Sequence, residues 1–462
     1  MRRSHLWLPV LFAHSAVLAI LYPDSYQQDG GYHFLCARFA YRYPDYLIGT
    51  WSRPLFTALY SIPAQLGYLP AKLLTAAVLC GTGWFTWKLA ETMRLARAWL
   101  VYPLLLVQPV VQLLSFDTMT EPLFALLLAA ALYYHRIGRP WIAALLISLL
   151  PMVRAEGFFL GFFWGVVMLA DPRIDVRFWL RWPKTSILLT GTLLWWGEAW
   201  AISGDPLYLA RTWVYRGGHE YGYPSLPWYG GVGFESAGPL VFVLVLIGLG
   251  RGWLRGHRML SLLFVYFFLL QAAVWEFGIA GGYARHFVCI SPVAAVLALL
   301  GLESTGRPTW PRVWATALGV GLAWSWTYGV RYVDSQRYLR DAPAVREAYR
   351  WYRSSEHPTP KRLAWSQAYM AILFDLDAGN PLPPFQSRES GLKKLREFGS
   401  GTLIFWDANT GPAWFRLDPR DFEAAGFRRI YGKKHRLQGY KGRLGLAPDF
   451  THDQEISLYL KE

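Results

Sequence analysis

The chain has 462 residues, of which 54% are hydrophobic and 24 are tryptophans, and its mean hydropathy is +0.20. Apolar runs recur about every 20 to 30 residues up to Tyr328, which excludes an ordinary soluble globular protein. The formal charge of +15 would suit a nucleic-acid partner, but Lys and Arg form short clusters between the apolar runs instead of one basic face. We therefore expect a mostly α-helical, polytopic membrane protein and no nucleic acid.

The basic clusters also predict the topology, because Lys and Arg accumulate in cytoplasmic loops. Arg2 and Arg3 place the N-terminus in the cytoplasm, and the later clusters alternate in register with the apolar runs. The first run, Leu6–Leu21, is interpreted as a retained span because no small-residue cleavage pattern follows it. On this scheme about eleven transmembrane helices are expected. They lie near residues 5–21, 70–90, 97–113, 119–135, 140–153, 157–170, 185–203, 238–250, 259–275, 287–302 and 311–329.

The same alternation places the loops 22–69 and 204–237 outside a plasma (inner) membrane. After Gly329 the composition becomes mixed polar and charged, which predicts two domains, 1–330 and 331–462. In the second, residues 344–355 and 390–398 have helical patterning, residues 422–426 end a helix, and residues 362–365, 402–406 and 456–460 are predicted strands. This small soluble α/β domain is expected on the outer side, as a lid, an acceptor-binding module or a simple stabilising cap.

The stretch Tyr22–Trp51 places acids, aromatic residues and two glycines directly after the first apolar run. Four of its residues recur at helical spacing: Tyr32, Leu35, Cys36 and Phe39. This pattern predicts a helix lying on the bilayer surface with its aromatic side chains at headgroup level. Gly30 and Gly31 allow tight backbone geometry after Asp29. Such a helix would hold Asp29 at the water boundary, beside a lipid headgroup.

The order Asp29, Tyr32, Ala37, Arg38 in this loop resembles a known family, the GT-C fold polytopic glycosyltransferases. These enzymes take a sugar from a polyprenyl-phosphate carrier on the outer side of the membrane. In bacterial aminoarabinose transferases and protein O-mannosyltransferases, the first external loop carries an Asp, often Asp-Glu, followed by an aromatic residue and Ala-Arg on an interfacial helix. Further similar segments are Trp51-Ser-Arg53-Pro54-Leu55, Thr120-Glu121-Pro122-Leu123-Phe124, Arg154-Ala-Glu156-Gly157, and Arg285 before Pro292.

One position departs from the family pattern, because Gly30 stands where the second acid of Asp-Glu is usual. A role that needs paired carboxylates would then fall to Asp24, Asp117 or Glu121. The C-terminal domain matches no motif of the family.

The resemblance implies an inverting membrane glycosyltransferase. It would move a sugar, a mannose-type hexose or similar, from polyprenyl phosphate to a hydroxyl of a lipid, glycan or protein acceptor. Asp29 would be the general base, the alternative being that Asp29 only caps the interfacial helix. Asp24, which follows Pro23 at the end of the first span, is a second candidate acid, and a structural role in the turn is an equal alternative.

The departing phosphate calls for an arginine on the outer side, because guanidinium stays charged and binds phosphate bidentately. The candidates are Arg285 with its neighbour His286, Arg154, Arg211 and Arg216. Arg285 is preferred, although it could equally be an interface anchor, and Arg154 could form a structural pair with Glu156. Candidate substrate-binding residues are Tyr32, His33, Asp117, Glu121, His219 and Glu220.

No cofactor and no metal are predicted. Asp117 and Glu121 are two acids in one turn, which is not a coordination sphere. The three cysteines, Cys36, Cys80 and Cys289, show neither metal-ligand spacing nor obvious pairing.

Two other functions remain alternatives. A transporter would need ionisable or broken segments near the midplane of several spans, and Glu198 is the main charge inside a predicted span. A polysaccharide polymerase or ligase would share the large external loop 204–237.

Overall fold

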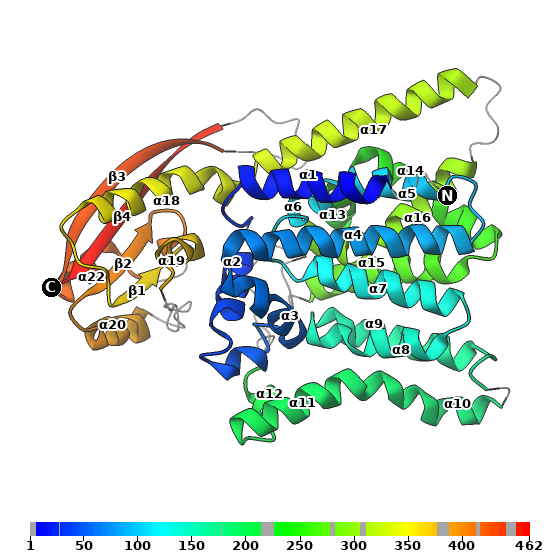
Figure 1. Cartoon of the computed structure of the whole chain (residues 1–462), viewed down its shortest axis with the longest axis horizontal. Coiled ribbons are helices and arrows are strands. Elements are labelled where there is room, and N and C mark those ends of the chain that lie inside the picture. Colours follow the sequence, from blue (N-terminus) through cyan, green and yellow to red (C-terminus); the bar gives the residue numbers. More distant parts are fainter. Residues whose placement is uncertain are drawn as a thin grey trace.

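The computed structural model describes residues 6–26, 28–175, 177–213, 226–277, 282–304, 311–376, 388–412, 416–439 and 450–462. It has two parts: a bundle of helices that run side by side, and a sheet domain at one end of the bundle (Figure 1). Helix α1 begins at the end of the bundle far from the sheet, and the chain finishes in the sheet domain (Figure 1).

The bundle contains most of the described helices. Up to residue 213 they are α1 (Trp7–Leu21), α4 (Tyr68–Thr92), η2 (Ala98–Leu100), α5 (Val101–Leu106), α6 (Pro109–Leu114), α7 (Glu121–Arg136), α8 (Pro140–Ser148), η3 (Leu150–Met152), α9 (Glu156–Ala170), α10 (Phe178–Lys184), η4 (Thr185–Leu189), α11 (Thr190–Ser203) and α12 (Tyr208–Arg211). From residue 226 onward they are α13 (Leu226–Ala237), α14 (Pro239–Leu254), α15 (Arg258–Glu276), η5 (Ala284–Ile290), α16 (Ser291–Ser304) and α17 (Pro311–Asp334).

Prolines set several of these boundaries. Pro109, Pro140 and Pro239 each open a helix, where the missing N–H costs nothing. The segment 97–113, expected as one span, is broken for this reason: α5 ends at Leu106 and the chain restarts as a helix at Pro109, which cannot donate to a continuing helix.

Two described helical segments are long and apolar enough to cross a membrane, Arg258–Glu276 with 19 residues and Ala284–Ser304 with 21. A third span is reached if Tyr229–Ala237 and Pro239–Leu254, which meet at a bend of 110°, count as one. Trp7–Leu21 and Glu156–Ala170 are shorter apolar helices, of 15 residues each. The number of eleven spans stays a prediction.

Three short elements connect α1 to α4 at the end of the bundle that faces the sheet domain (Figure 1). They are α2 (Gln28–Phe39), η1 (Pro44–Leu47) and α3 (Pro54–Gln65). The helix predicted after the first apolar run is thus present as α2, and Asp29 lies in its first turn. Helices α2 and α3 pack against each other, so the loop forms a folded platform beside the bundle.

The sheet domain holds four strands in the order β1-β2-β4-β3. They are β1 (Arg362–Trp365), β2 (Thr402–Asp407), β3 (Phe427–Gly439) and β4 (Phe450–Lys461). Strands β1 and β2 are parallel, and β4 runs antiparallel to both β2 and β3. The helices around the sheet are α18 (Arg337–Ser354), α19 (Ala368–Phe374), α20 (Arg388–Glu397) and α22 (Pro419–Ala424).

The predicted strands at 362–365, 402–406 and 456–460 are confirmed, while β3 was not predicted. Its sequence, FRRIYGKKHRLQG, lacks a clean apolar alternation. Strand β3 is at the edge of the sheet, where basic side chains are tolerated and protect the open edge.

One continuous apolar core joins the two parts, from Leu11 of α1 to Leu458 of β4. Helix α17 runs through the expected boundary at Arg331 as far as Asp334. The division into domains 1–330 and 331–462 stays a prediction.

The outward orientation of the sheet domain is testable at two exposed positions. A cysteine at Lys393 in α20 should react with a membrane-impermeant maleimide in intact cells, whereas one at Arg139, in the turn between α7 and α8, should react only after permeabilisation. Protection of the Lys393 cysteine in intact cells would reverse the topology. The parent chain is the control, because its own Cys36 and Cys289 are buried and Cys80 is half-buried.

Candidate active site

The structure brings together Asp29 and Arg285, which lie 256 residues apart in the chain. Asp29 stands in the first turn of α2, and Arg285 stands in η5. The Arg285 Nη2 atom donates to Asp29 Oδ2 at 2.7 Å. The Asp29 side chain is 19% exposed and the Arg285 side chain 8%, so the carboxylate is the more accessible member of the pair.

Glu121 connects this pair to a second arginine. It is the first residue of α7 and is fully buried. Its Oε1 atom lies 3.4 Å from Arg285 Nε and 2.7 Å from Arg154 Nη1. A carboxylate at a helix N-terminus is favourable by itself, because it faces the positive end of the helix dipole. Glu121 therefore neutralises two buried guanidinium groups at once.

Arg154 continues the network to Glu156. Its Nη2 atom donates to Glu156 Oε1 at 2.9 Å, its Nε atom donates to Glu156 Oε2 at 3.2 Å, and its Nη1 atom donates to the Thr120 hydroxyl at 3.0 Å. Glu156 is the first residue of α9 and so repeats the position of Glu121 in α7. The Arg154–Glu156 pair expected from the sequence is present, and it belongs to the same network as Arg285.

His286 and Gln271 lie next to Glu156, at the end of the network opposite Asp29. The His286 Nδ1 atom lies 3.0 Å from Gln271 Oε1 and 3.9 Å from Glu156 Oε1. Gln271 was missed by the sequence reasoning, although a polar residue inside the apolar run of α15 is a recognisable signal. Three carboxylates thus alternate with two guanidinium groups, and every one of these charges has an opposite charge within 3.4 Å.

Asp24 and Asp117 lie in a neighbouring polar cluster around Lys72. The Lys72 ammonium donates to the carbonyls of Tyr22 and Asp24 at 2.7 and 2.6 Å. The Asp24 carboxylate accepts from the Ser25 amide at 2.7 Å. Asp24 is buried, and this burial raises the pKa of its carboxyl well above its usual range.

Asp117 explains why the position after Asp29 is a glycine. Its carboxylate accepts from the amides of Tyr26 and Thr118 at 2.8 and 2.7 Å, and burial raises its pKa to about 6. A Cβ atom at Gly30 would lie 2.5 Å from Asp117 Oδ1, closer than such atoms can approach. The carboxylate of Asp117, 87 residues further along the chain, therefore fills the space beside the backbone where the family pattern has its second acid.

The remaining predicted residues have different surroundings. His33 is buried against Phe56, and burial lowers the pKa of its imidazole to about 3, so His33 is neutral near pH 7. Tyr32 is half-buried on the same helix. Arg211 is exposed and pairs with Asp205 at 2.9 Å. Arg216, His219 and Glu220 lie outside the described residues.

Arg53 is a buried residue near His33; it belongs to a segment that resembles the family, but it was not predicted as a site residue. It directly precedes Pro54 and has a φ of 65°, a backbone conformation that side chains other than glycine rarely adopt. Such a conformation costs on the order of 1–2 kcal/mol and persists only where the surroundings enforce it. The strained residue lies close enough to His33 to influence its charge.

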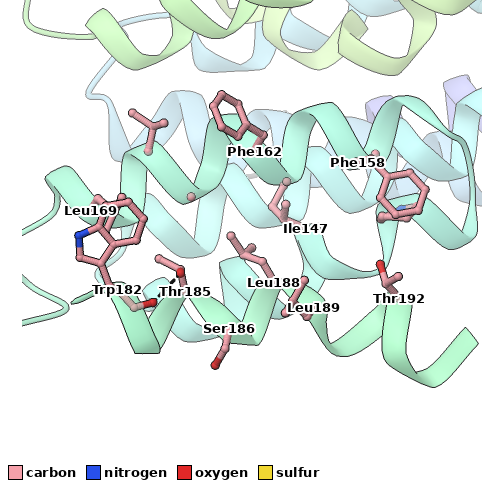
Figure 2. A pocket seen from close by; sticks show the side chains of 15 residues that line it. Ile147, Phe158, Phe162, Leu169, Trp182, Thr185, Ser186, Leu188, Leu189 and Thr192 are labelled. Atoms are coloured by element: carbon pink, nitrogen blue, oxygen red, sulfur yellow. Dashed lines mark hydrogen bonds between the residues drawn. The ribbon is translucent and has the colours of Figure 1, made fainter. Parts of the chain in front are cut away.

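An apolar groove of about 540 Å³ runs along α9 from the end that carries Glu156. Figure 2 shows Phe158 and Thr192 at one end, Leu169 and Trp182 at the other, and Ile147 and Leu188 between them. At Gly161 an added Cβ would meet no atom within 4 Å, so this glycine leaves the groove open. Among the described residues, no group of three or more His, Cys, Asp or Glu side chains could hold a metal ion.

Comparison with solved structures identifies the fold. The crystal structure of ArnT from Cupriavidus metallidurans bound to undecaprenyl phosphate matches with a TM-score of 0.68 and 10% identity, over 98% of this chain and 97% of that one. The same enzyme in the apo state matches with a TM-score of 0.62 and 11% identity, over 97% of each chain. A tethered-peptide structure of the Archaeoglobus fulgidus oligosaccharyltransferase gives a TM-score of 0.48 and 12% identity, over 92% of this chain and 72% of that one. No family model and no curated protein matches the sequence.

The charge network predicts a large stability loss when Glu121 becomes Gln. This change keeps the side-chain shape but leaves two buried guanidinium groups without their shared carboxylate, and breaking such a buried pair costs roughly 3–5 kcal/mol. The expected result is a clear fall in the melting temperature of the detergent-solubilised protein.

Glu303→Gln is the matched control, because Glu303 pairs with the more exposed Arg255 at 3.2 Å and pairs of that kind contribute about 0–1 kcal/mol. Equal melting temperatures for Glu121→Gln and Glu303→Gln would show that the buried network contributes no more than a surface pair.

Proposed function

We propose that this GT-C fold protein is a membrane glycosyltransferase that uses a polyprenyl-phosphate sugar as donor and an acceptor hydroxyl on the outer side of the membrane. The observation that carries the proposal is the Asp29–Arg285 pair at 2.7 Å, which places a partly accessible carboxylate beside a buried guanidinium. General base and phosphate-binding cation are the two groups that this reaction needs side by side. The similarity to an ArnT structure that binds undecaprenyl phosphate supports the class of donor.

In the proposed reaction, Asp29 accepts the proton of the acceptor hydroxyl while its oxygen attacks the anomeric carbon of the sugar. The bond between that carbon and the phosphate oxygen breaks, and polyprenyl phosphate leaves with the bonding electrons. A single displacement of this kind inverts the anomeric centre. The negative charge on the leaving phosphate is stabilised by Arg285, because guanidinium remains charged at every relevant pH.

The ion pair between Asp29 and Arg285 implies that the donor binds before Asp29 accepts a proton. Phosphate oxygens that approach Arg285 compete with Asp29 for the same Nη2 donor. Donor binding would therefore weaken the ion pair and leave the Asp29 carboxylate free to accept a proton. Glu121, which contacts Arg285 from the other side, would keep the guanidinium in place during this exchange.

The other predicted residues support this arrangement in different ways. Arg154 and His286 lie behind Arg285 in the network, so we propose that they help to fix its position. Asp24 and Asp117 are buried and accept backbone amides, so we propose that they build the loop around Asp29 rather than contact the acceptor. Tyr32 and His33 lie about one helical turn after Asp29 on α2 and remain candidates for binding the sugar.

We also propose that the groove along α9 holds part of the prenyl chain. It begins at Gly157, the residue after Glu156, so one end of the groove lies next in the chain to the charged network. Its lining is almost entirely apolar, and Phe162 and Trp182 are exposed at its edge, as expected for a surface in contact with hydrocarbon. A polar headgroup at Arg285 and an apolar tail along α9 would match the two ends of the donor.

The base role of Asp29 predicts that Asp29→Asn abolishes sugar transfer. The amide cannot accept the proton, and loss of a general base typically costs about 10²–10⁴-fold in rate. The measurement is the single-turnover transfer rate from a polyprenyl-phosphate sugar to its acceptor in purified protein. Donor binding, measured separately, should be retained. A variant that keeps more than about a tenth of the wild-type rate would remove Asp29 from this role.

The prenyl groove predicts a chain-length effect when Gly161 is changed to Trp. The indole would fill the open part of the groove, and each displaced CH₂ group costs about 0.8 kcal/mol. The KM for a long-chain donor should rise about tenfold or more, because every 1.4 kcal/mol corresponds to a factor of ten.

A donor with only two isoprene units occupies less of the groove, so the variant should raise its KM much less than it raises the KM of a long-chain donor. Gly197→Trp is the matched control, since Gly197 also faces open space but belongs to α11 outside the groove. The proposal fails if long and short donors are affected to the same extent.

A further inference from the structure

Helix α19 of the sheet domain packs against α2, the helix that carries Asp29. Figure 1 shows α19 as the element of the sheet domain nearest to the platform formed by α2 and α3. Two sets of contacts join these helices, one near Asp29 and one at the opposite end of α2. Together they connect the C-terminal domain directly to the catalytic helix.

The first contact surrounds Asp29. The backbone amide of Ala368 donates to Gln28 Oε1, in the residue just before Asp29. Two residues after Asp29, a Cβ atom built on Gly31 would lie 2.7 Å from Ala368 Cβ and 3.6 Å from Ile372 Cδ1. Carbon atoms pack at about 3.5–4.0 Å, so only glycine permits this approach of the two helices.

The second contact is a bidentate ion pair at the end of α2. Arg38 donates from Nε to Asp375 Oδ1 at 3.1 Å and from Nη2 to Asp375 Oδ2 at 2.8 Å. Its Nη1 atom donates to the carbonyls of Ala64 and Gln65 at 3.1 and 2.6 Å, and Gln65 Nε2 donates back to the Arg38 carbonyl at 2.8 Å. One side chain therefore joins α2, the end of α3 and the residue that ends α19.

Asp375 adopts an uncommon backbone conformation to make this pair. Its φ is 47°, in the left-handed region that Asp tolerates better than most residues. The conformation ends α19 at the point where the carboxylate meets Arg38. Since Arg38 is one of the residues that carry the family resemblance, this geometry gives that arginine a specific task in the present chain.

We propose that α19 sets the position of the catalytic helix, with Gly31, Arg38 and Asp375 as positioning residues for Asp29. This inference rests on the proposed role of Asp29 as the base. Asp29 is bonded to the bundle through Arg285 and is carried by a helix that the C-terminal domain holds at both ends. A shift of α2 would change the distance from the carboxylate to the acceptor hydroxyl, and about 1 Å of misplacement can cost about 10²-fold in rate.

The test adds one methyl group to the helix contact and then makes room for it. Gly31→Ala should lower kcat at least about tenfold while the donor KM changes less than about twofold, because Arg285 and the groove are untouched. The double variant Gly31→Ala/Ala368→Gly should recover most of the lost kcat. Gly319→Ala is the control, because it adds a methyl group in a helix where no atom lies within 4 Å.

A second measurement does not depend on sugar transfer. Amide hydrogen exchange in α2 should accelerate in Asp375→Ala, which removes the ion pair, and less in Asp375→Glu, which keeps the charge. Glu347→Ala is the control, because Glu347 pairs with Lys433 inside the sheet domain and away from α2.

The possible outcomes separate the two proposals. Wild-type kcat in Gly31→Ala, or no recovery in the double variant, would overturn the positioning role. Unchanged α2 exchange in Asp375→Ala would overturn it as well. Absence of any sugar transfer by the wild-type protein would instead refute the proposed function, and the exchange experiment would still decide whether α19 holds α2.

Discussion

The alternating charges from Asp29 through Arg285, Glu121 and Arg154 to Glu156 are the interaction on which the end of the bundle that carries α2 depends. Removing ions from water is costly, and the cost is met only because each carboxylate contacts a guanidinium and each guanidinium contacts two carboxylates. The network also joins α2, η5, α7 and α9, four elements that are distant in the sequence. It therefore fixes the mutual positions of these elements as well as the charges.

The Asp29 side chain at one end of this network is 19% exposed and the Glu156 side chain at the other end is 13% exposed, while Glu121 between them is fully buried. A base must meet its substrate, so the more exposed Asp29 end is the one that fits the proposed reaction. The two guanidinium groups, each 8% exposed, lie between these carboxylates. The polar cluster of Lys72, Asp24 and Asp117 fixes the backbone of the loop. It does so through hydrogen bonds to the turn that precedes α2.

The sequence predicted the local features well and the long-range contacts only in part. Charge alternation and helical spacing were enough to expect a helix after Asp29, and the short apolar alternation of residues 362–365 was enough for β1. The ranking of Arg285 among the arginines came from its position in the chain, but its partner 256 residues away could not be known from spacing. Gln271 was missed although a polar residue inside an apolar run is a usable signal, and β3 was missed because it is a basic edge strand without apolar alternation.

The contact of Gly30 with Asp117 has a consequence for how this sequence can change over time. Even a Cβ atom at position 30 would lie 2.5 Å from the Asp117 oxygen, so a side chain there requires the buried Asp117 carboxylate to leave its two amide partners. The two positions are therefore coupled in this chain: a residue other than glycine at 30 calls for a different residue, or a different side-chain position, at 117. A substitution at position 30 alone passes through a crowded intermediate.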